Sequence, residues 1–175
     1  MNLLIIEGSP FPVSKTEVIA EEIKSQIEQP EHKVDIVKLS EWDIPILGSG
    51  KTEDVEKLKR LAEEADAFII GTPNYHTSFS GALKNVLDHL STDEFEMKPV
   101  GLFCVSGGMR NTDPLTQLRL VMRGLHGLTI PTQISAADAD FEKDESGHPY
   151  LYNQGVKQRI SVMIDSLTEL VYKVK

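Results

Sequence analysis

The sequence contains the stretch Gly71-Thr-Pro-Asn-Tyr-His-Thr-Ser-Phe-Ser-Gly-Ala-Leu-Lys-Asn-Val-Leu-Asp-His-Leu90. It begins where the apolar run 67–71 predicts a buried strand, and it closes with apolar side chains at helical spacing over 83–90. Pro73 fixes its own φ and restricts Thr72 to extended conformations, so the intervening loop leaves the strand along a defined path. A stiff polar and aromatic loop of this kind suits a planar heteroaromatic ligand. A plain strand-to-helix turn accounts for the same residues without a ligand.

Strand and helix patterns alternate on both sides of this stretch. Apolar runs predict strands over 3–6, 34–37, 67–71, 99–105 and 128–134. Helical spacing predicts helices from Val18 to a stop at Pro30, from Thr52, over 83–90, from Asp113 and from Val156. Pro131 favours an edge position for the last strand, because proline cannot donate to a strand ladder. Residues 136–153 are expected to form an acidic loop with a turn at 144–147.

This alternation predicts an α/β fold with right-handed crossovers and a parallel sheet covered on both faces. With five strands, the expected architecture is a flavodoxin-like three-layer sandwich with strand order 2-1-3-4-5. Neither a repeat nor a linker interrupts the pattern, so residues 1–175 are expected to form a single domain. The first, third and fourth strands are neighbours in this order. The three unusual loops that follow them should therefore converge on one crevice.

Composition limits the classes of function. The chain has 175 residues, of which 40% are hydrophobic and 26% charged, as in ordinary globular proteins. Its net charge of -9 argues against binding to nucleic acid or an anionic membrane, which would repel it. Residues 1–7 lack the basic region of a signal peptide, and no apolar run is long enough to span a bilayer. Cys104, the single cysteine, is expected in the core. Together these features predict a soluble cytoplasmic protein.

The first loop is Gly8-Ser-Pro-Phe-Pro-Val-Ser-Lys-Thr16. It places hydroxyl groups around the start of a helix, where free amides and the helix dipole favour an anion. A phosphate monoester fits these donors, with Lys15 as an additional positive charge. The loop matches neither the Walker pattern nor the G-x-G-x-x-G dinucleotide turn. A capped helix start after a proline-bearing turn is the alternative.

The third loop contains Ser106-Gly107-Gly108. Adjacent glycines let a backbone approach a bulky group closely, and its amides could donate to the edge of a flat ring. A simple Gly-Gly turn is the alternative. Together the three loops describe an FMN site, with the phosphate at the first helix and the isoalloxazine between the second and third loops. The histidines are scattered without ligand spacing, so no metal site is predicted.

Motifs in all three loops are shared with a known family. They are Gly8-Ser-Pro with Ser14-Lys-Thr16, Gly71-Thr-Pro-Asn-Tyr-His76 with Ser78, Ser80-Gly81 and Leu83-Lys-Asn85, and Ser106-Gly-Gly108. On these residues the chain resembles the NADPH-dependent FMN reductase family, and within it the bacterial FMN-dependent NADPH-azoreductases. The similarity continues through Lys98-Pro-Val-Gly101, Pro114-Leu115, Pro131-Thr-Gln-Ile134 and Asp138-Ala-Asp-Phe141. Many members carry an arginine in the phosphate loop, where this chain has Phe11, Pro12 and Val13.

The resemblance implies one FMN per subunit in a homodimer or homotetramer. It further implies that two electrons pass from NADPH or NADH to azo dyes, quinones or similar small acceptors by ping-pong turnover. By position, the implied FMN-binding residues are Ser9, Ser14, Lys15 and Thr16 at the phosphate, Pro73, Asn74, Tyr75 and His76 along the isoalloxazine, and Ser106, Gly107 and Gly108 on its far side. No side chain is assigned as an acid or base, because the flavin carries the chemistry.

Two other functions remain open from the sequence. A flavodoxin-type electron carrier would suit the acidic composition, but the threonine-rich phosphate turn of that class is absent after the first strand. A flavin-free α/β interaction domain is the second. The choice between NADPH and NADH is also open, since nothing in the sequence places Arg110, Arg119 or Arg123 beside a 2′-phosphate.

Overall fold

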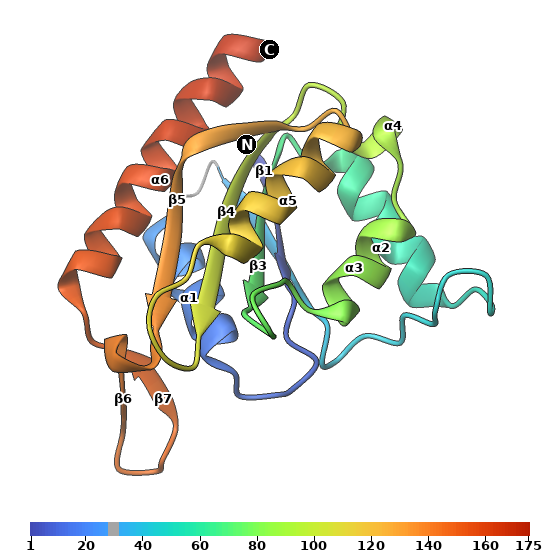
Figure 1. The fold of residues 1–175 in the computed structure, drawn as a ribbon. Coiled ribbons are helices and arrows are strands. Elements are labelled where there is room, and N and C mark those ends of the chain that lie inside the picture. Colours follow the sequence, from blue (N-terminus) through green and yellow to red (C-terminus); the bar gives the residue numbers. More distant parts are fainter. Residues whose placement is uncertain (28–31) are drawn as a thin grey trace.

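A computed structural model describes residues 1–27 and 32–175. Five parallel strands form one sheet in the order β2-β1-β3-β4-β5 (Figure 1). They are β1 (Asn2–Glu7), β2 (Lys33–Lys38), β3 (Ala67–Pro73), β4 (Pro99–Ser106) and β5 (Leu128–Ala137). The flavodoxin-like order is as predicted. β5 is an edge strand, as Pro131 indicated, and its register with β4 shifts between Val100 and Leu102.

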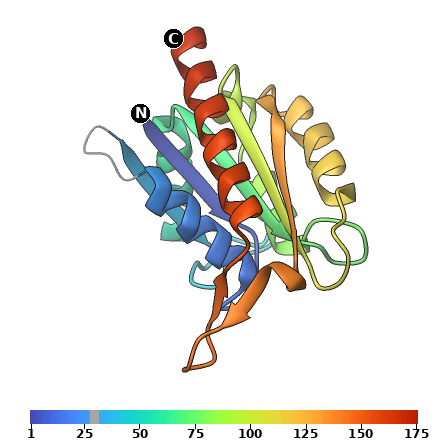
Figure 2. The same ribbon diagram turned by 90° about the vertical axis from the view of Figure 1, so that its left-hand side faces the viewer.

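Helices cover both faces of the sheet (Figures 1 and 2). One face carries α1 (Lys15–Ile27) and α6 (Gln154–Val174). The other carries α2 (Glu53–Glu64), α3 (Gly81–Asp88), the short α4 (Thr92–Phe95) and α5 (Asp113–Gly124). The predicted stop of the first helix at Pro30 lies outside the described residues.

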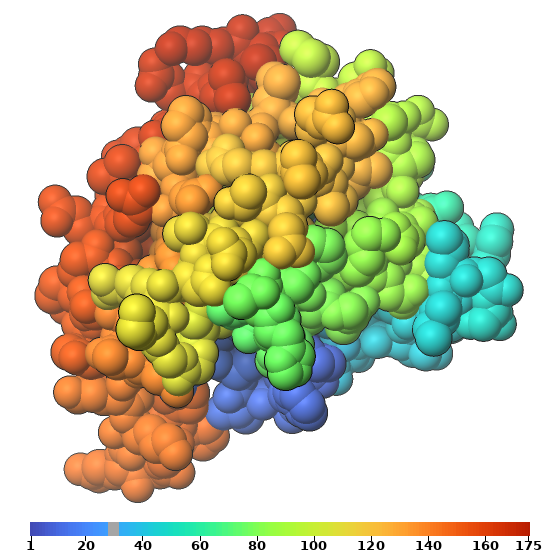
Figure 3. Space-filling view, viewed as in Figure 1, coloured from blue at the N-terminus to red at the C-terminus, as the bar shows by residue number. Residues whose placement is uncertain are grey.

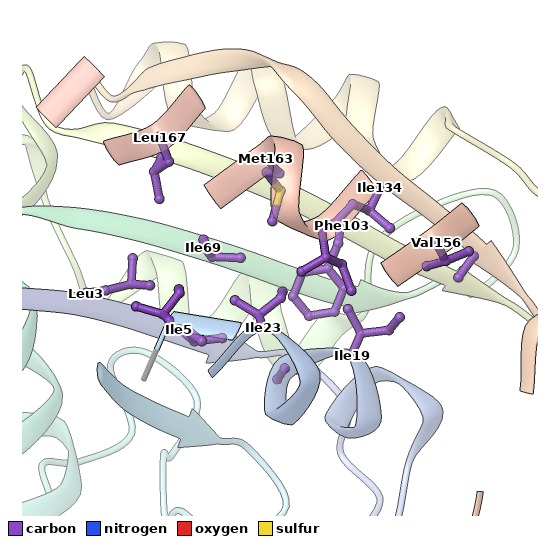
Figure 4. Close-up of a cluster of buried hydrophobic side chains, with 14 of the residues drawn as sticks. Leu3, Ile5, Ile19, Ile23, Ile69, Phe103, Ile134, Val156, Met163 and Leu167 are labelled. Atoms are coloured by element: carbon purple, nitrogen blue, oxygen red, sulfur yellow. The ribbon is translucent and has the colours of Figure 1, made fainter. Parts of the chain in front are cut away.

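The core is divided between the two faces because side chains alternate along each strand. In β1, Leu3 and Ile5 pack toward α1 and α6, whereas Leu4 and Ile6 pack toward the opposite helices. Figure 4 shows the first group, in which strand side chains meet those of α1 and α6. Burial on both faces explains the continuous apolar runs in the sequence, and each fully buried Leu or Ile contributes about 1.5–3 kcal/mol.

Two glycines set the close packing at the carboxyl ends of β1 and β3. A Cβ on Gly71 would lie 1.9 Å from the Phe103 ring, which fills that space. A Cβ on Gly8 would lie 2.6 Å from the Gly71 carbonyl oxygen, to which the Gly8 amide already donates at 2.9 Å. The first loop therefore leaves β1 directly against the end of β3.

The segment 136–153, predicted as an acidic loop, is more ordered than expected. β5 continues to Ala137, a 3₁₀ helix follows over Asp138–Asp140, and β6 (Phe141–Lys143) pairs with β7 (Pro149–Leu151) in an antiparallel hairpin. The predicted turn is present at its tip, where the Gly147 amide donates to the Asp144 carbonyl oxygen at 3.0 Å. These strands were missed because three residues show too little alternation to be recognised.

Candidate functional site

The three predicted loops surround one cleft of about 300 Å³ at the carboxyl ends of β1, β3 and β4. In Figure 3 the segments after β1 (blue), β3 (green) and β4 (yellow) lie next to one another on this edge. Nine predicted site residues line the cleft: Ser9, Ser14, Lys15, Thr16, Pro73, Asn74, Tyr75, Ser106 and Gly107. The other two, His76 and Gly108, are outside its lining.

Sequence reasoning missed further residues of this lining, which are Phe11, Pro12, Val13, Val105 and Asp138. The first three lie between predicted phosphate-loop residues, so their position in the chain was a usable signal. Asp138 lies in the motif Asp138-Ala-Asp-Phe141 that is shared with the family, but it was not assigned to the site, because the fifth strand was expected to end at 134. Its extension to Ala137 is what carries Asp138 to the cleft.

The second loop forms a small hairpin. The Asn74 amide donates to the Val105 carbonyl oxygen at 2.7 Å, and Tyr75 and Ser78 exchange backbone hydrogen bonds of 2.9 and 3.1 Å. His76 and Thr77 make the reversal with φ values of 52° and 63°. Left-handed backbone is rare for a β-branched threonine, so the flanking bonds must hold it in place. This turn puts His76 at an exposed tip rather than beside the cleft.

Ser80 fastens the second loop to the first. Its hydroxyl donates to the Gly8 carbonyl oxygen at 2.5 Å and accepts the Leu83 amide at 3.0 Å, which caps α3. Its own amide donates to the Thr72 hydroxyl at 2.9 Å. All of these groups are buried, so the spacing between the two loops is fixed by satisfied hydrogen bonds.

Asn74 supplies one hydrogen-bond acceptor more than the described residues satisfy. Its side-chain nitrogen donates to the Ser106 hydroxyl at 3.1 Å. Its Oδ1 is buried and has no partner among the described residues. An unpaired buried carbonyl oxygen costs about 1–3 kcal/mol. Asn74 lines the cleft, so this unpaired acceptor belongs to the wall of the candidate site.

The third loop leaves open space over its glycines. A Cβ added to Gly107 or Gly108 would meet no atom within 4 Å, and neither glycine has a left-handed φ. Within the described structure, no neighbouring atom would clash with a larger side chain at either position. The space over them is available to a ligand.

The donors of the first loop face inward. The Ser14 hydroxyl donates to Glu7 Oε1 at 3.1 Å and accepts the Glu17 amide at 2.9 Å. The Ser9 hydroxyl donates to the Phe11 carbonyl oxygen at 3.2 Å. These bonds engage two of the three hydroxyl groups that the sequence predicted for the phosphate.

Thr16 and Lys15, the other two residues predicted at the phosphate, differ in whether the protein already engages their side chains. No hydrogen bond within the described part of the chain engages the Thr16 hydroxyl, although this residue is only 2% exposed. The Lys15 ammonium lies 2.7 Å from a carboxylate oxygen of Asp138. Thr16 therefore keeps a free donor for an anion, whereas the charge of Lys15 is largely neutralised.

A buried carboxyl group lies beneath the first loop. Glu7, the last residue of β1, is 1% exposed, and its Oε1 also accepts the Ser9 amide at 3.1 Å. Burial raises the pKa of Glu7 to about 7, against the smaller lowering effect of the Ser9 and Ser14 hydrogen bonds. The sequence offered one signal for it, a charged residue closing an apolar run directly before Gly8-Ser9.

A larger hollow of about 520 Å³ lies between α1 and the β6–β7 hairpin. Its lining includes Glu17, Glu21 and Glu22, whose carboxylates would repel a phosphate. It shares Val13 and Ser14 with the cleft. The cleft is the better candidate, because three loops line it and its carboxylate, Asp138, is paired with Lys15.

Other predicted features have structural roles. Cys104 is buried in β4 as expected, and burial raises the pKa of its thiol to about 11. The Arg119 guanidinium donates to the Gln133 side chain and the Ile130 carbonyl oxygen, so it braces β5. Arg110 forms an ion pair with the buried Asp140. Across residues 1–27 and 32–175, no acidic, histidine or cysteine cluster is placed to hold a metal, and no helix could cross a bilayer.

Comparison with known proteins identifies relatives over nearly the full chain. The family model for NADPH-dependent FMN reductase matches residues 1–142. An FMN-dependent NADPH-azoreductase from Staphylococcus saprophyticus is 41% identical, over 98% of this chain and 95% of the relative. A protein of the same name from Staphylococcus aureus strain USA300 is 40% identical over the same shares. The fold is similar to that of FerB, a flavoenzyme NAD(P)H:(acceptor) oxidoreductase from Paracoccus denitrificans, with a TM-score of 0.78, 17% identity and coverage of 98% and 97%.

Proposed function

The chain belongs to the NADPH-dependent FMN reductase family, and on this premise we propose that it is an FMN-dependent NAD(P)H reductase of the azoreductase type. In this proposal two electrons pass from NADPH or NADH to azo dyes, quinones or similar small acceptors. The names of its relatives support FMN and NADPH as the cofactor and the reductant. The observation that carries the proposal is the single cleft lined by the three loops.

The residues present fit FMN. Thr16 offers an unengaged hydroxyl at the start of α1, where helix amides favour a phosphate. Asn74 offers the unpaired acceptor for a ring N–H, and Gly107 leaves room for a flat ring. Pro73, Tyr75 and Ser106 complete the proposed ring site, with Ser9, Ser14 and Lys15 at the phosphate. His76 and Gly108, which lie outside the lining, would act only at the margin of the ring.

The protein contributes orientation rather than an acid or base. Bound FMN supplies two-electron redox chemistry between the reductant and the acceptor. The Tyr75–Ser78 hairpin, held by backbone bonds, keeps one wall of the cleft in position. The Ser80–Gly8 bond fixes the distance from this wall to the first loop. A rigid cleft of this kind positions a ring without rearrangement during turnover.

We further propose that the two substrates use the same mouth of the cleft in turn. Support comes from the three loops, which enclose one shared opening. Double-reciprocal plots with NADPH and an azo dye or quinone should then be parallel, and high acceptor should inhibit competitively against NADPH. Intersecting lines together with a ternary complex would overturn the shared mouth and leave the FMN assignment in place.

The two alternatives are separated by simple observations. A flavodoxin-type carrier would bind FMN but would not oxidise NADPH rapidly by itself. A flavin-free interaction domain would stay colourless after incubation with excess FMN. Rapid NADPH oxidation by the FMN-loaded protein alone excludes both.

Assembly and location are also part of the proposal. A homodimer or homotetramer is supported by large apolar side chains on the surface, among them Ile46 and Met109, which are 75% and 89% exposed. Light scattering on the eluting protein would measure the subunit number. A cytoplasmic location is supported by the acidic composition and the single cysteine, which is buried and free.

A further inference from the structure

Glu7 is a buried carboxyl group for which the proposed redox chemistry has no use. Its neighbours across the sheet are Lys38 in β2 and Gly71 in β3. Its Oε1 accepts both the Ser9 amide and the Ser14 hydroxyl, each at 3.1 Å. Those two residues belong to the proposed phosphate site. Glu7 and an incoming phosphate therefore compete for the same donors.

The Ser14 hydroxyl has a single proton, so it can donate either to Glu7 or to a phosphate, but not to both. A serine hydroxyl has one proton and two acceptor lone pairs. One lone pair accepts the Glu17 amide, and the proton goes to Glu7 while that carboxyl is ionised. If Glu7 is protonated, its O–H can donate to the remaining lone pair of Ser14. The Ser14 proton is then free to point into the cleft.

The surrounding charges do not stabilise an ionised Glu7 strongly. Glu17 faces it from α1 with like charge, and Lys38 faces it from β2 with opposite charge. The Lys38 ammonium is shared between Glu17 and Glu21, at 2.8 Å from each. Tyr75 faces Glu7 from the second loop, and its pKa is raised first by burial and second by the charge of Glu7. A phosphate carrying about -1.5 to -2 charges would add further repulsion.

We propose that Glu7 is a positioning residue that couples FMN binding to the uptake of one proton. The proton comes from solvent, neutralises the Glu7 carboxylate, and reverses the Glu7–Ser14 hydrogen bond so that Ser14 donates to the phosphate. This inference rests on the proposed function. Since burial raises the pKa of Glu7 to about 7, uptake is expected at neutral and alkaline pH.

The first test is calorimetric titration of the FMN-free protein with FMN at pH 8.5, in two buffers with different ionisation enthalpies. The second phosphate pKa is near 6, so free FMN is already a dianion at this pH and takes no part in the proton balance. Wild type should take up close to one proton per FMN. Glu7→Gln should take up none.

The second test is the pH dependence of the FMN dissociation constant, measured by quenching of flavin fluorescence. The side-chain amide that Glu7→Gln introduces is neutral at every pH, so this variant removes the titration of position 7 while keeping the size of the side chain. Between pH 6 and pH 8.5 the FMN dissociation constant of wild type should rise about 30-fold more than that of Glu7→Gln. The factor follows because pH 8.5 lies 1.5 units above a pKa of about 7. Glu22→Gln, a control in α1 whose carboxylate pairs with Lys157 rather than with Lys38, should keep the wild-type dependence.

The outcomes distinguish the coupling from the cofactor assignment. Tight FMN binding without proton uptake, or parallel pH curves for wild type and Glu7→Gln, overturns the coupling and leaves the proposed function in place. Failure of both proteins to bind FMN at pH 6 overturns the proposed function and the coupling with it. A pH-dependent gap between the two curves, together with uptake of one proton, supports the coupling.

Discussion

The loops after β1 and β3 form two walls of the same cleft, but they hold their polar groups differently. The loop after β3 is held by bonds to neighbouring strands and leaves the Asn74 acceptor unpaired. The loop after β1 directs Ser9 and Ser14 onto its own carbonyl and carboxyl groups. Backbone hydrogen bonds hold the loop after β3, whereas in the loop after β1 the Ser14 hydroxyl and the Ser9 amide donate to the ionisable Glu7. One wall is ready for a ligand, and the other must first release its donors.

The largest effect is expected from removing the Ser80 hydroxyl, which links the two loops. Ser80→Ala should lower the free energy of unfolding by about 2–4 kcal/mol, because it removes the α3 cap and leaves the Gly8 carbonyl oxygen unpaired. Ser78→Ala is the matched control in the same loop. Its hydroxyl donates to the partly exposed Gln117, so its loss should cost about 1 kcal/mol or less. Equal losses in urea unfolding would contradict the anchoring role of Ser80.

The next effect concerns the charge beneath the first loop. Burial raises the pKa of Glu7 from 4.5 to about 7, so the folded FMN-free protein binds more protons than the unfolded chain between these values. The free energy of unfolding should therefore fall by about 3 kcal/mol as the pH rises through this window, and stay low above it. Glu7→Gln should remove this fall and be more stable than wild type at pH 8. Urea unfolding of both proteins at pH 5 and pH 8 measures these free energies. An equal difference between wild type and Glu7→Gln at the two pH values would argue against a buried, neutral Glu7.

A third prediction compares the free and engaged hydroxyl groups of the first loop. Thr16→Val should weaken FMN binding by about 10- to 150-fold, since a hydrogen bond to a charged group contributes about 1.5–3 kcal/mol. Thr16→Ser keeps the hydroxyl and should stay near wild type. Ser9→Ala should weaken FMN binding less than Thr16→Val does, because the Ser9 hydroxyl already donates to the Phe11 carbonyl oxygen. A Thr16→Val variant with wild-type affinity would place the phosphate elsewhere.

The smallest effect is expected at Lys15. Its ammonium pairs with Asp138, and the two side chains are 32% and 50% exposed. Exposed ion pairs contribute about 0–1 kcal/mol, so Lys15→Ala should change the FMN dissociation constant by about fivefold or less. Lys24→Ala, in the last turn of the same helix, should leave it unchanged. A loss above about tenfold would mean that Lys15 leaves Asp138 to bind the phosphate.

The same contrast explains how much the sequence could predict. Apolar strands and right-handed crossovers dictate the sheet order, and the sheet order dictates that the three loops meet. The residues of the second loop were therefore predictable. Its hairpin was not, because His76 and Thr77 adopt left-handed backbone without the glycine that usually indicates it.

The first loop was predictable in position but not in charge. Ser9, Ser14 and Thr16 were expected to be equivalent donors, yet only Thr16 remains unengaged in the described structure. The Ser9 hydroxyl is engaged by the Phe11 carbonyl oxygen within the loop, and the Ser14 hydroxyl is engaged by Glu7, whose burial depends on how α1 packs over the end of β1. Such packing is a tertiary property that no local pattern reveals. The hairpin over 141–151 was missed for a similar reason, since its short strands gain their order from pairing with each other.

The most direct test of the central claim is an FMN titration of the purified protein, followed by NADPH addition without oxygen. Because one cleft is formed by the three loops, we expect saturation at one FMN per chain, a preference over FAD, and full loss of the flavin absorbance on adding NADPH. No flavin absorbance in the protein after incubation with excess FMN would contradict the account. Bound flavin that NADPH leaves oxidised would contradict the proposed reductase.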